Sequence, residues 1–550
     1  MFSWIRGDQM YRSDSRGQLE FPDFYLPFSG HLDPDNRWIA LARLVPWELA
    51  EAIYLESLCD GFGAPALPAR VALGALLIKE RLGLTDRETV EAIQENPYLQ
   101  FFLGKEEFEH VRPFDASLMV DFRKRFGEEG LTRISEAIAL ASLSPANESH
   151  AVSPPEPADH HHEPPPDDGN SAAAQEASMD AEPAAPPASD GQANQGKLIV
   201  DATCAPADIR YPTDVSLLNE AREKTEELID ELHAPLVGRA VRPRTYRVKA
   251  RRVFVAFVRQ KNPSRKTIRR ATRQQLAFLR RNLKQIDLLL DNSQALPLAG
   301  LSRRLYRNLL VCREVYRQQL HMYQSNTRRI DDRIVSISQP HVRPIKRGKA
   351  GRDTEFGAKL SLSVIGGFSF VDRLSWDNYN ESLDLIEQIE TFHRRFGFSP
   401  ESVHADKIYR TRANRAYCKQ HGIRLSGPPL GRRPQHVSAE DRKQAAADEA
   451  IRNIVEGKFG QAKRRFGLGR VMAKLVSTSA AQISLSFLVM NLERALRRFF
   501  FSLVWDWSRW SRLFQTVLRR TAQPSPLHHR PQSQRPSRPR PAFTSPKLTR

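Results

Sequence analysis

Three carboxylates in this chain have neighbours that could support chemistry on a charged substrate: Asp201, Asp406 and Glu456. Each aspartate follows a short apolar run, in LIVD and in SVHAD. An isolated aspartate in such a place is more commonly a turn or capping residue. A set of carboxylates has another use, because Mg²⁺ is a hard cation that prefers oxygen ligands. Two such cations about 4 Å apart can activate the attacking oxygen and stabilise the leaving oxygen in phosphodiester cleavage.

The neighbourhood of Glu456 is the most informative of the three. Arg452, Glu456 and Lys463 are separated by four and seven residues. On a helix, both separations return a side chain to the same face. That face would carry a carboxylate ligand flanked by two cations able to hold phosphates. The plainer alternative is an exposed Arg–Glu pair at i,i+4, which stabilises a helix by roughly 0.2–0.5 kcal/mol.

Two segments predict the strands that would position the first aspartate. Leu198–Val200 is a short apolar run of the kind found in buried strands, and this strand would end at Asp201. Residues 352–380 predict two further strands, because LSLSVI and FSFVDRL alternate apolar and polar residues. Gly366 and Gly367 lie between them and would form the turn.

The remaining carboxylates fall in a strand and a helix. A helix is expected in LDLIEQIETFHRRFG, followed by a short strand in ESVHADKIY that ends near Asp406. A second helix is expected in RANRAYCKQHG, and residues 448–466 predict the helix that contains Glu456. Residues 471–515 predict an amphipathic helix that packs on the core. This order of elements indicates an α/β fold with acidic residues at strand ends and on a flanking helix.

Residues 216–330 predict a mainly helical insert after the first strand. Apolar side chains recur there at alternating steps of three and four, the spacing of a helix–helix contact. They lie at Leu276, Leu279, Leu283, Ile286 and Leu290, with partners expected at Leu305, Leu309 and Cys312. Residues 239–281 also carry sixteen Lys and Arg and no acid. Because a solvated face normally mixes both signs, this segment favours contact with phosphates.

The whole chain is strongly basic. Its 550 residues include 83 Lys and Arg against 64 Asp and Glu, a net charge of +19, which indicates nucleic acid or an anionic membrane surface as partner. No run of eighteen apolar residues could span a bilayer, and the first residues lack the apolar core of a secretory signal. The four cysteines form no CxxC pair, so neither a zinc site nor a disulfide framework is indicated. These features favour a cytoplasmic protein that binds nucleic acid and no membrane.

Three segments flank or separate the predicted catalytic part, residues 197–515. Residues 1–144 predict a helical domain for DNA binding or dimerisation, with a capping box in TDRE. Residues 145–196 hold ten Asp and Glu, no Lys or Arg and many Pro, Ala and Ser, which predicts a disordered acidic linker. Residues 516–550 are rich in basic residues and proline and predict a disordered tail.

The spacing Arg452-(3)-Glu456-(6)-Lys463 resembles the Y-(2)-R-(3)-E-(6)-K signature of bacterial insertion-sequence transposases with a DDE catalytic core. The tyrosine position of that signature is Glu449 here. LIVDATCAPADIRYPTD resembles the segment around the first aspartate of the family, and VHADKIYRTRANRAYCKQHG resembles the segment around the second. The helical N-terminal segment is similar too. The resemblance covers most of residues 40–145 and 197–495.

The resemblance implies an RNase H-like core in which Asp201, Asp406 and Glu456 bind two Mg²⁺ ions, or Mn²⁺ in their place. It implies hydrolysis at the transposon end and then strand transfer of the freed 3′-hydroxyl into target DNA, with Arg452 and Lys463 at DNA phosphates. It also implies a homodimer or larger synaptic complex, in the cytoplasm of a bacterium at the nucleoid.

Two other functions use the same residues differently. A metal-dependent nuclease or resolvase on the same core would need the carboxylates without strand joining, and a transposon-derived DNA-binding protein would need neither. Among the neighbouring residues, His404 shares a strand face with Asp406 and could touch the site, but we interpret it as a packing residue. Lys359 and Arg410 could contact DNA phosphates, but we interpret both as solvated cations.

Overall fold

The computed structural model describes most of the chain, which forms two compact units, residues 1–498 and 499–550. The described residues are 26, 30–58, 65–144, 193–291, 301–346, 354–427 and 438–521, with side chains described as far as residue 500. The predicted acidic linker lies outside them, apart from residues 193–196, as does the predicted tail beyond residue 521. No described helix is long and apolar enough to cross a membrane.

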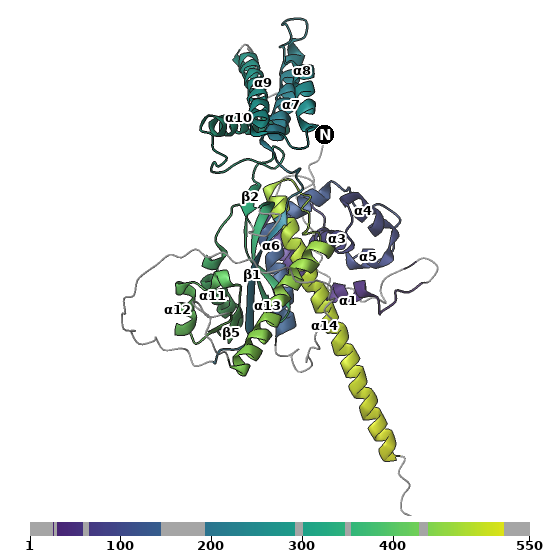
Figure 1. Cartoon of the computed structure of the whole chain (residues 1–550). Helices are drawn as coiled ribbons and strands as arrows, with labels where there is room; N and C mark the ends of the chain where they lie inside the picture. Colours follow the sequence, from purple (N-terminus) through teal and green to yellow (C-terminus); the bar gives the residue numbers. More distant parts are fainter. Residues whose placement is uncertain are drawn as a thin grey trace, which may run out of the picture. The chain divides into compact units, whose positions relative to one another are not determined.

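The described part of the chain contains one mixed sheet accompanied by many helices, which confirms the predicted α/β class (Figure 1). Its strands are β1 (Lys197–Pro206), β2 (Arg343–Lys346), β3 (Thr354–Ile365), β4 (Phe368–Ser375), β5 (Ser402–His404) and β6 (Arg424–Leu425). The order is β2-β3-β1-β5-β6, and β4 also pairs with β3. β3 is antiparallel to β1, β2 and β4, whereas β5 runs parallel to β1 and β6 parallel to β5.

The central strand β1 is longer than its sequence predicted. It continues past Asp201 to Pro206, so the prediction that it ends at Asp201 is wrong. The cause is pairing, because residues 202–206 extend the ladder with β3. Gly357 of β3 lets the two backbones approach closely there, since a Cβ on it would lie 2.0 Å from the Ala205 carbonyl oxygen. Asp201 is therefore held within a strand rather than in a loop.

The predicted strand pair around Gly366 and Gly367 is confirmed as the β3–β4 hairpin. The two glycines have φ of 58° and 83°, a region that glycine adopts at little cost. β3 pairs with β2 through its first residues and with β4 from Lys359 onward. This long strand joins the hairpin to the centre of the sheet.

The expected helices of the catalytic part are confirmed as α11 (Leu385–Phe396), α12 (Arg412–Gln420), α13 (Ala439–Arg465) and α14 (Val476–Thr521). α13 begins before the predicted residue 448, because Ser438 caps it by accepting a hydrogen bond from the Asp441 amide. α14 packs its residues up to Leu496 into the core, as predicted, and continues beyond the expected domain end at residue 515.

The described N-terminal residues form the predicted helices. These are α1 (Arg37–Leu44), α2 (Trp47–Leu55), α3 (Ala69–Leu82), α4 (Asp86–Glu95), α5 (Pro97–Phe102) and α6 (Leu118–Leu143). The predicted capping box is confirmed at Thr85 and Glu88, which bond each other's backbone amides. Pro97 follows the end of α4 and opens α5, the helix position at which proline is best tolerated.

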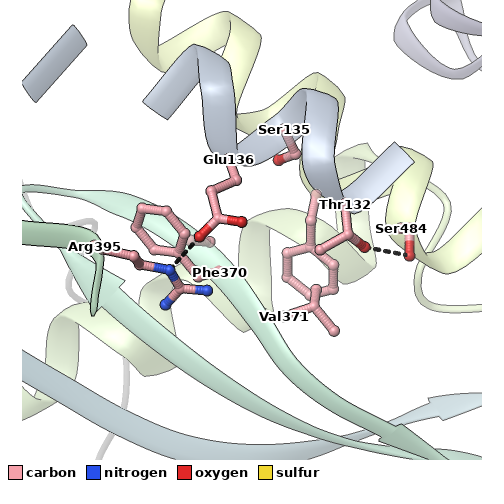
Figure 2. A pocket seen from close by; sticks show the side chains of 9 residues that line it. Thr132, Ser135, Glu136, Phe370, Val371, Arg395 and Ser484 are labelled. Carbon is pink, nitrogen blue, oxygen red and sulfur yellow. Dashed lines mark hydrogen bonds and ion pairs between the residues drawn. The ribbon is translucent and has the colours of Figure 1, made fainter. Parts of the chain in front are cut away.

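These N-terminal helices share a polar junction with the sheet. Figure 2 shows Glu136 of α6 paired with Arg395 of α11, and the Arg395 guanidinium lies over the Phe370 ring of β4. The Thr132 hydroxyl of α6 bonds the Ser484 hydroxyl of α14 at 3.4 Å. The helical segment is therefore built into the same compact unit as the sheet.

A buried ion pair reinforces this junction. Arg81 of α3 contacts Glu493 of α14 at 2.5 Å, both side chains are less than a tenth exposed, and the Arg81 guanidinium lies over the Trp38 ring. Beside it, the Glu80 carboxylate accepts a hydrogen bond from the Ser486 hydroxyl at 2.9 Å. Burial raises the pKa of Glu80 to about 7.

The predicted helical insert consists of α7 (Asp214–His233), η4 (Ala234–Leu236), α8 (Arg247–Val258), α9 (Arg265–Asp291) and α10 (Arg303–Gln324) (Figure 1). The predicted seam on α9 packs against α10 as expected, and α7 completes the cluster. Leu279 and Ile286 are fully buried there beside Leu309 and Cys312. The apolar spacing thus reports helix packing within the insert.

Candidate active site

The pairing of two parallel strands places the aspartates at equivalent positions. The ladder between β1 and β5 ends at the pair Ile199–His404. Asp201 and Asp406 each lie two residues beyond that pair, where the two strands separate. Asp201 stays in β1, opposite Leu362 of β3. Asp406 leaves the sheet and caps the short helix η6 (Lys407–Tyr409), accepting a hydrogen bond from the Lys407 amide at 2.6 Å.

Asp201 is a largely buried carboxylate in a negative field. One of its oxygens accepts a hydrogen bond from the Ala202 amide at 2.8 Å. Burial raises the pKa of Asp201 to about 6, and the charges of Asp406 and Glu456 raise it as well, against the opposing effects of the Ala202 amide and of Arg452. The three predicted carboxylates therefore act on one another electrostatically.

α13 brings Glu456 to this place because its apolar face packs on the sheet. Val455, Phe459 and Ala462 are buried, and α13 contacts both β1 and β5. Glu456 follows Val455 and is exposed at the side of this contact. Its carboxylate accepts a hydrogen bond from Arg452 at 3.0 Å, as the i,i+4 spacing predicted.

Glu449 also binds Arg452, a contact that the spacing of charges did not bring out. The Arg452 guanidinium donates two hydrogen bonds to Glu449, at 2.6 and 3.2 Å, and one to Glu456. These partners raise the pKa of Arg452, Glu449 first. Glu449, at the tyrosine position of the signature, thus accepts two of these three hydrogen bonds from Arg452. Lys463 lies in the last turn of α13, and its contact with DNA stays a prediction.

A second contact fixes α13 to the parallel strands. Asp448 of α13 accepts two hydrogen bonds from Arg424 of β6, at 2.7 and 2.9 Å. His404 of β5 is fully buried, with Nδ1 3.6 Å from Asp448 and Nε2 3.1 Å from the Ser402 hydroxyl. Burial lowers the pKa of His404, against the opposing effect of Asp448. The interpretation of His404 as a packing residue is confirmed.

The interpretation of Lys359 and Arg410 as solvated cations is wrong. Lys359 is buried, pairs with Glu381 and donates a hydrogen bond to the Tyr379 carbonyl at 2.7 Å. Arg410 is half-buried and donates to three successive backbone carbonyls of residues 425–427. Both cations hold local structure near the aspartates, and their burial depends on tertiary contacts that no local pattern reports.

Tyr409 is a further residue beside the site that the sequence did not single out. It lies three residues after Asp406 and is fully buried. Among the described residues, its hydroxyl has no hydrogen-bond partner. Burial raises its pKa well above the usual value, and the charge of Asp201 adds to this effect. The tyrosine in DKIY could have been noticed as an aromatic side chain one short turn after the aspartate.

Divalent cations suit this set of donors chemically. Asp201, Asp406 and Glu456 offer only oxygen ligands, which Mg²⁺ and Mn²⁺ prefer. Burial is the main cause of the raised pKa of Asp201, and a cation among the three would offset the repulsion that Asp406 and Glu456 add to it. Within the described ranges, however, no group of three or more His, Cys, Asp or Glu side chains lies close enough together to hold a metal ion. The charges of Asp406 and Glu456 thus act on Asp201, but the three carboxylates do not lie close enough together to hold a metal ion as they stand.

Comparison with known proteins gives two matches to family models, both of transposases. The transposase DDE domain matches residues 403–493, which contain Asp406, Arg452, Glu456 and Lys463. The transposase domain of unknown function 772 matches residues 27–125. Together they support a DDE transposase of the insertion-sequence type, an enzyme class that binds and acts on DNA. Asp201 lies outside both matched ranges.

A curated relative adds a shorter match. An uncharacterized protein, ORF8 in the nfe locus of Rhizobium meliloti, is 37% identical over 116 residues, which are 20% of this chain and 54% of the relative. The chain thus spans about half the length of the relative it matches. No solved structure matches the chain.

Proposed function

We propose that this chain is a DNA transposase that cuts DNA at transposon ends and joins the freed ends to target DNA. The observation that carries the proposal is the placement of Asp201 and Asp406 at equal offsets beyond the Ile199–His404 pair, with Glu456 on the helix that contacts both β1 and β5. A basic chain with such a carboxylate set is suited to phosphodiester chemistry. The two transposase family matches support the same class.

The proposed core is RNase H-like. In support, β1 is central, with an antiparallel hairpin on one side and parallel strands on the other. The first two carboxylates come from adjacent parallel strands and the third from a helix that packs on both. The insert α7–α10 follows β1 in the chain and separates the first aspartate from the second along the sequence.

Asp201, Asp406 and Glu456 would hold two Mg²⁺ or Mn²⁺ ions, which supply activation of the attacking oxygen and stabilisation of the leaving oxygen when bound. The chain itself would orient the scissile phosphate. Arg452 can exchange one of its carboxylate partners for a phosphate oxygen, since its guanidinium donates in several directions. Lys463 would contact a neighbouring phosphate along the same helix.

The chemistry of the proposal is two successive displacements at phosphorus. Water attacks the phosphodiester at the transposon end, one P–O bond forms, another breaks, and a 3′-hydroxyl is released. That hydroxyl attacks a target phosphodiester, so again one P–O bond replaces another, with no covalent bond to the protein. Two ends must be held together for joining, so the proposal includes a homodimer or larger complex at the bacterial nucleoid.

An assay of products tests this function against its alternatives. The substrate is labelled DNA carrying the sequences that flank this gene, incubated with the full chain, Mg²⁺ and a supercoiled target plasmid. A transposase gives both cleaved ends and label joined to the plasmid. Cleaved ends without joined product would favour a nuclease or resolvase, and binding without cleavage would favour a DNA-binding protein.

A further inference from the structure

The helical insert carries two rows of exposed cations that the candidate active site does not use. Along α8 and its C-cap residue Arg259, a shallow hollow is lined by residues at helical spacing, Val248, Arg251, Arg252, Val255 and Arg259, together with Ala256. On α9, a second row lies on the exposed side of the helix. Its exposed members are Lys266, Arg270, Arg273, Arg280 and Lys284.

The cations of these rows are free of acidic partners. Within the described part of the chain, no carboxylate pairs with Arg251, Arg252 or Arg259, and none pairs with the α9 row. Other arginines of the insert differ, because Arg304 pairs with Glu227 and Arg313 pairs with Asp287. Among the described residues, the two rows therefore carry positive charge that no ion pair offsets, whereas Arg304 and Arg313 are paired.

The placement of charge on α9 opposes the helix dipole at both ends. Its first turn has Arg265 and Lys266 and no acid, and its last turns have Asp287 and Asp291 and no base. Each such charge is unfavourable, because a helix has partial positive charge at its N-terminus and partial negative charge at its C-terminus. α13 shows the favourable order, with acids in its first turn and bases in its last. Cations kept at an unfavourable end suggest an anionic partner that the protein itself does not supply.

The N-cap residue of α8, Tyr246, contacts two arginines. The guanidiniums of Arg244, just before α8, and Arg281 of α9 lie 5.0 and 4.6 Å from the ring centre of Tyr246. Tyr246 has a φ of 54°, in the left-handed region that a tyrosine rarely adopts. This contact links the start of α8 to α9.

The exposed apolar residues fit a nucleic acid better than a membrane. The exposed apolar side chains on the outer face of α8 are valine and alanine, which bury little area, whereas Phe254 and Phe257 are partly covered. An amphipathic helix that binds membranes normally presents bulky residues to the lipid. Arginines that recur along a helix without acidic partners among the described residues suit the regular phosphates of a duplex.

We propose that the exposed cations of α8 and α9 form a surface that binds the phosphate backbone of duplex DNA away from the carboxylates. This inference rests on the proposed function, which supplies DNA as the substrate, and it assigns the insert a role in holding DNA. Backbone contact of this kind carries no sequence information and depends steeply on salt.

The test measures binding alone, so it does not depend on catalysis. The full chain binds a 30-bp duplex of random sequence in EDTA at several salt concentrations. Two triple variants replace the free cations, R251Q/R252Q/R259Q on α8 and K266Q/R270Q/R273Q on α9. The matched control is R304Q/R313Q/R317Q, which removes the same charge from arginines of the insert that already pair with acids.

Each phosphate contact contributes about 0.9 to the slope of log K against log salt. Each α8 or α9 variant should therefore flatten the slope by about 2 to 3 and weaken binding at least about tenfold at low salt. The control should keep the slope of the unchanged protein, and thermal unfolding should show that every variant is folded at the assay temperature. Equal slopes for all proteins would overturn the proposal.

A vesicle experiment tests whether these cations bind an anionic membrane rather than DNA. If vesicles of 70% phosphatidylcholine and 30% phosphatidylglycerol bind the chain through the same arginines while DNA binding is unchanged, the DNA assignment is wrong. Because no step involves cleavage, a flattened slope supports this surface even if the chain cuts no DNA. Conversely, cleavage with unchanged slopes would leave the transposase proposal intact and refute this one.

Discussion

Asp201 in β1 and Asp406 just after β5 each lie two residues beyond the Ile199–His404 pair, at which the two parallel strands separate. Because β1 and β5 run in the same direction, both chains leave this pair from the same end of the ladder. Two carboxylates that are far apart in sequence thereby share one electrostatic field. The predictions below follow from this arrangement and from the elements that maintain it.

Replacing Asp201 by Asn should stabilise the metal-free protein at high pH. The pKa of Asp201 is about 6 in the folded state and about 3.9 in an unfolded chain. Below about pH 4 the carboxyl is largely protonated in both states. Between about pH 4 and pH 6 the unfolded chain releases the proton while the folded state keeps it, so the folded state loses stability across this window and the loss is complete above it. We expect D201N to gain about 2 kcal/mol in the free energy of unfolding at pH 8 in EDTA, and almost nothing at pH 4.

Urea denaturation at the two pH values measures this difference. D331N, at an exposed aspartate, is the control and should behave like the unchanged protein at both. An equal gain for D201N at pH 4 and pH 8 would mean that its effect is packing rather than charge.

Divalent cations should stabilise the folded protein through the three carboxylates. A ligand that binds only the folded state raises its stability by mass action. We expect 10 mM MgCl₂ to raise the thermal midpoint of the unchanged chain, and to raise it clearly less in D201N and E456Q. Sodium chloride at matched ionic strength serves as control. The same rise in all three proteins would show a general salt effect with no role for these side chains.

The buried pair of Arg81 and Glu493 should be costly to break from one side. Removing one partner leaves an uncompensated buried charge, which typically costs about 3–5 kcal/mol. We expect R81M to lower the free energy of unfolding by about 3 kcal/mol and the double variant R81M/E493L to recover much of it. Denaturation curves of the single and double variants measure this. If the double variant is as unstable as R81M, packing rather than charge dominates the junction.

Gly357 should be required for the long β1–β3 ladder. A Cβ at this position would lie 2.0 Å from the Ala205 carbonyl oxygen, so the strands must move apart. We expect G357A to destabilise the fold by at least about 2 kcal/mol. G457A is the matched control, because nothing lies within 4 Å of its added Cβ and alanine favours a helix by about 1 kcal/mol. Thermal unfolding of both variants measures these effects. A G357A variant as stable as the unchanged protein would contradict the close approach of β3 to the Ala205 carbonyl.

Elements with strong local signals were predictable from the sequence. Gly366 and Gly367 mark the hairpin because few other residues adopt positive φ, and the apolar seam of α9 marks helix packing by its spacing alone. The short strands β2 and β6 were not predicted. Their few residues form strands only because β3 and β5 lie alongside, and such pairing depends on distant parts of the chain.

In the candidate site, too, contacts with a local sequence signal were predictable, whereas contacts that depend on tertiary packing were not. Helical spacing predicted that Arg452 and Glu456 share a face, and the structure shows their hydrogen bond. It did not bring out Glu449 as the stronger partner of Arg452, nor the burial of Lys359 beside Glu381. Both depend on how α13 and β3 are seated among their neighbours. The roles of the carboxylates as metal ligands stay predictions.

The most direct test of the central claim compares D406N with the unchanged chain on DNA that carries the flanking ends, in Mg²⁺. We predict that D406N binds this DNA with unchanged affinity while cleavage and joining fall at least about a thousandfold, or ~4 kcal/mol in barrier. D331N should cut and join like the unchanged protein. Cleavage and joining by D406N at the unchanged rate would contradict the assignment of the site.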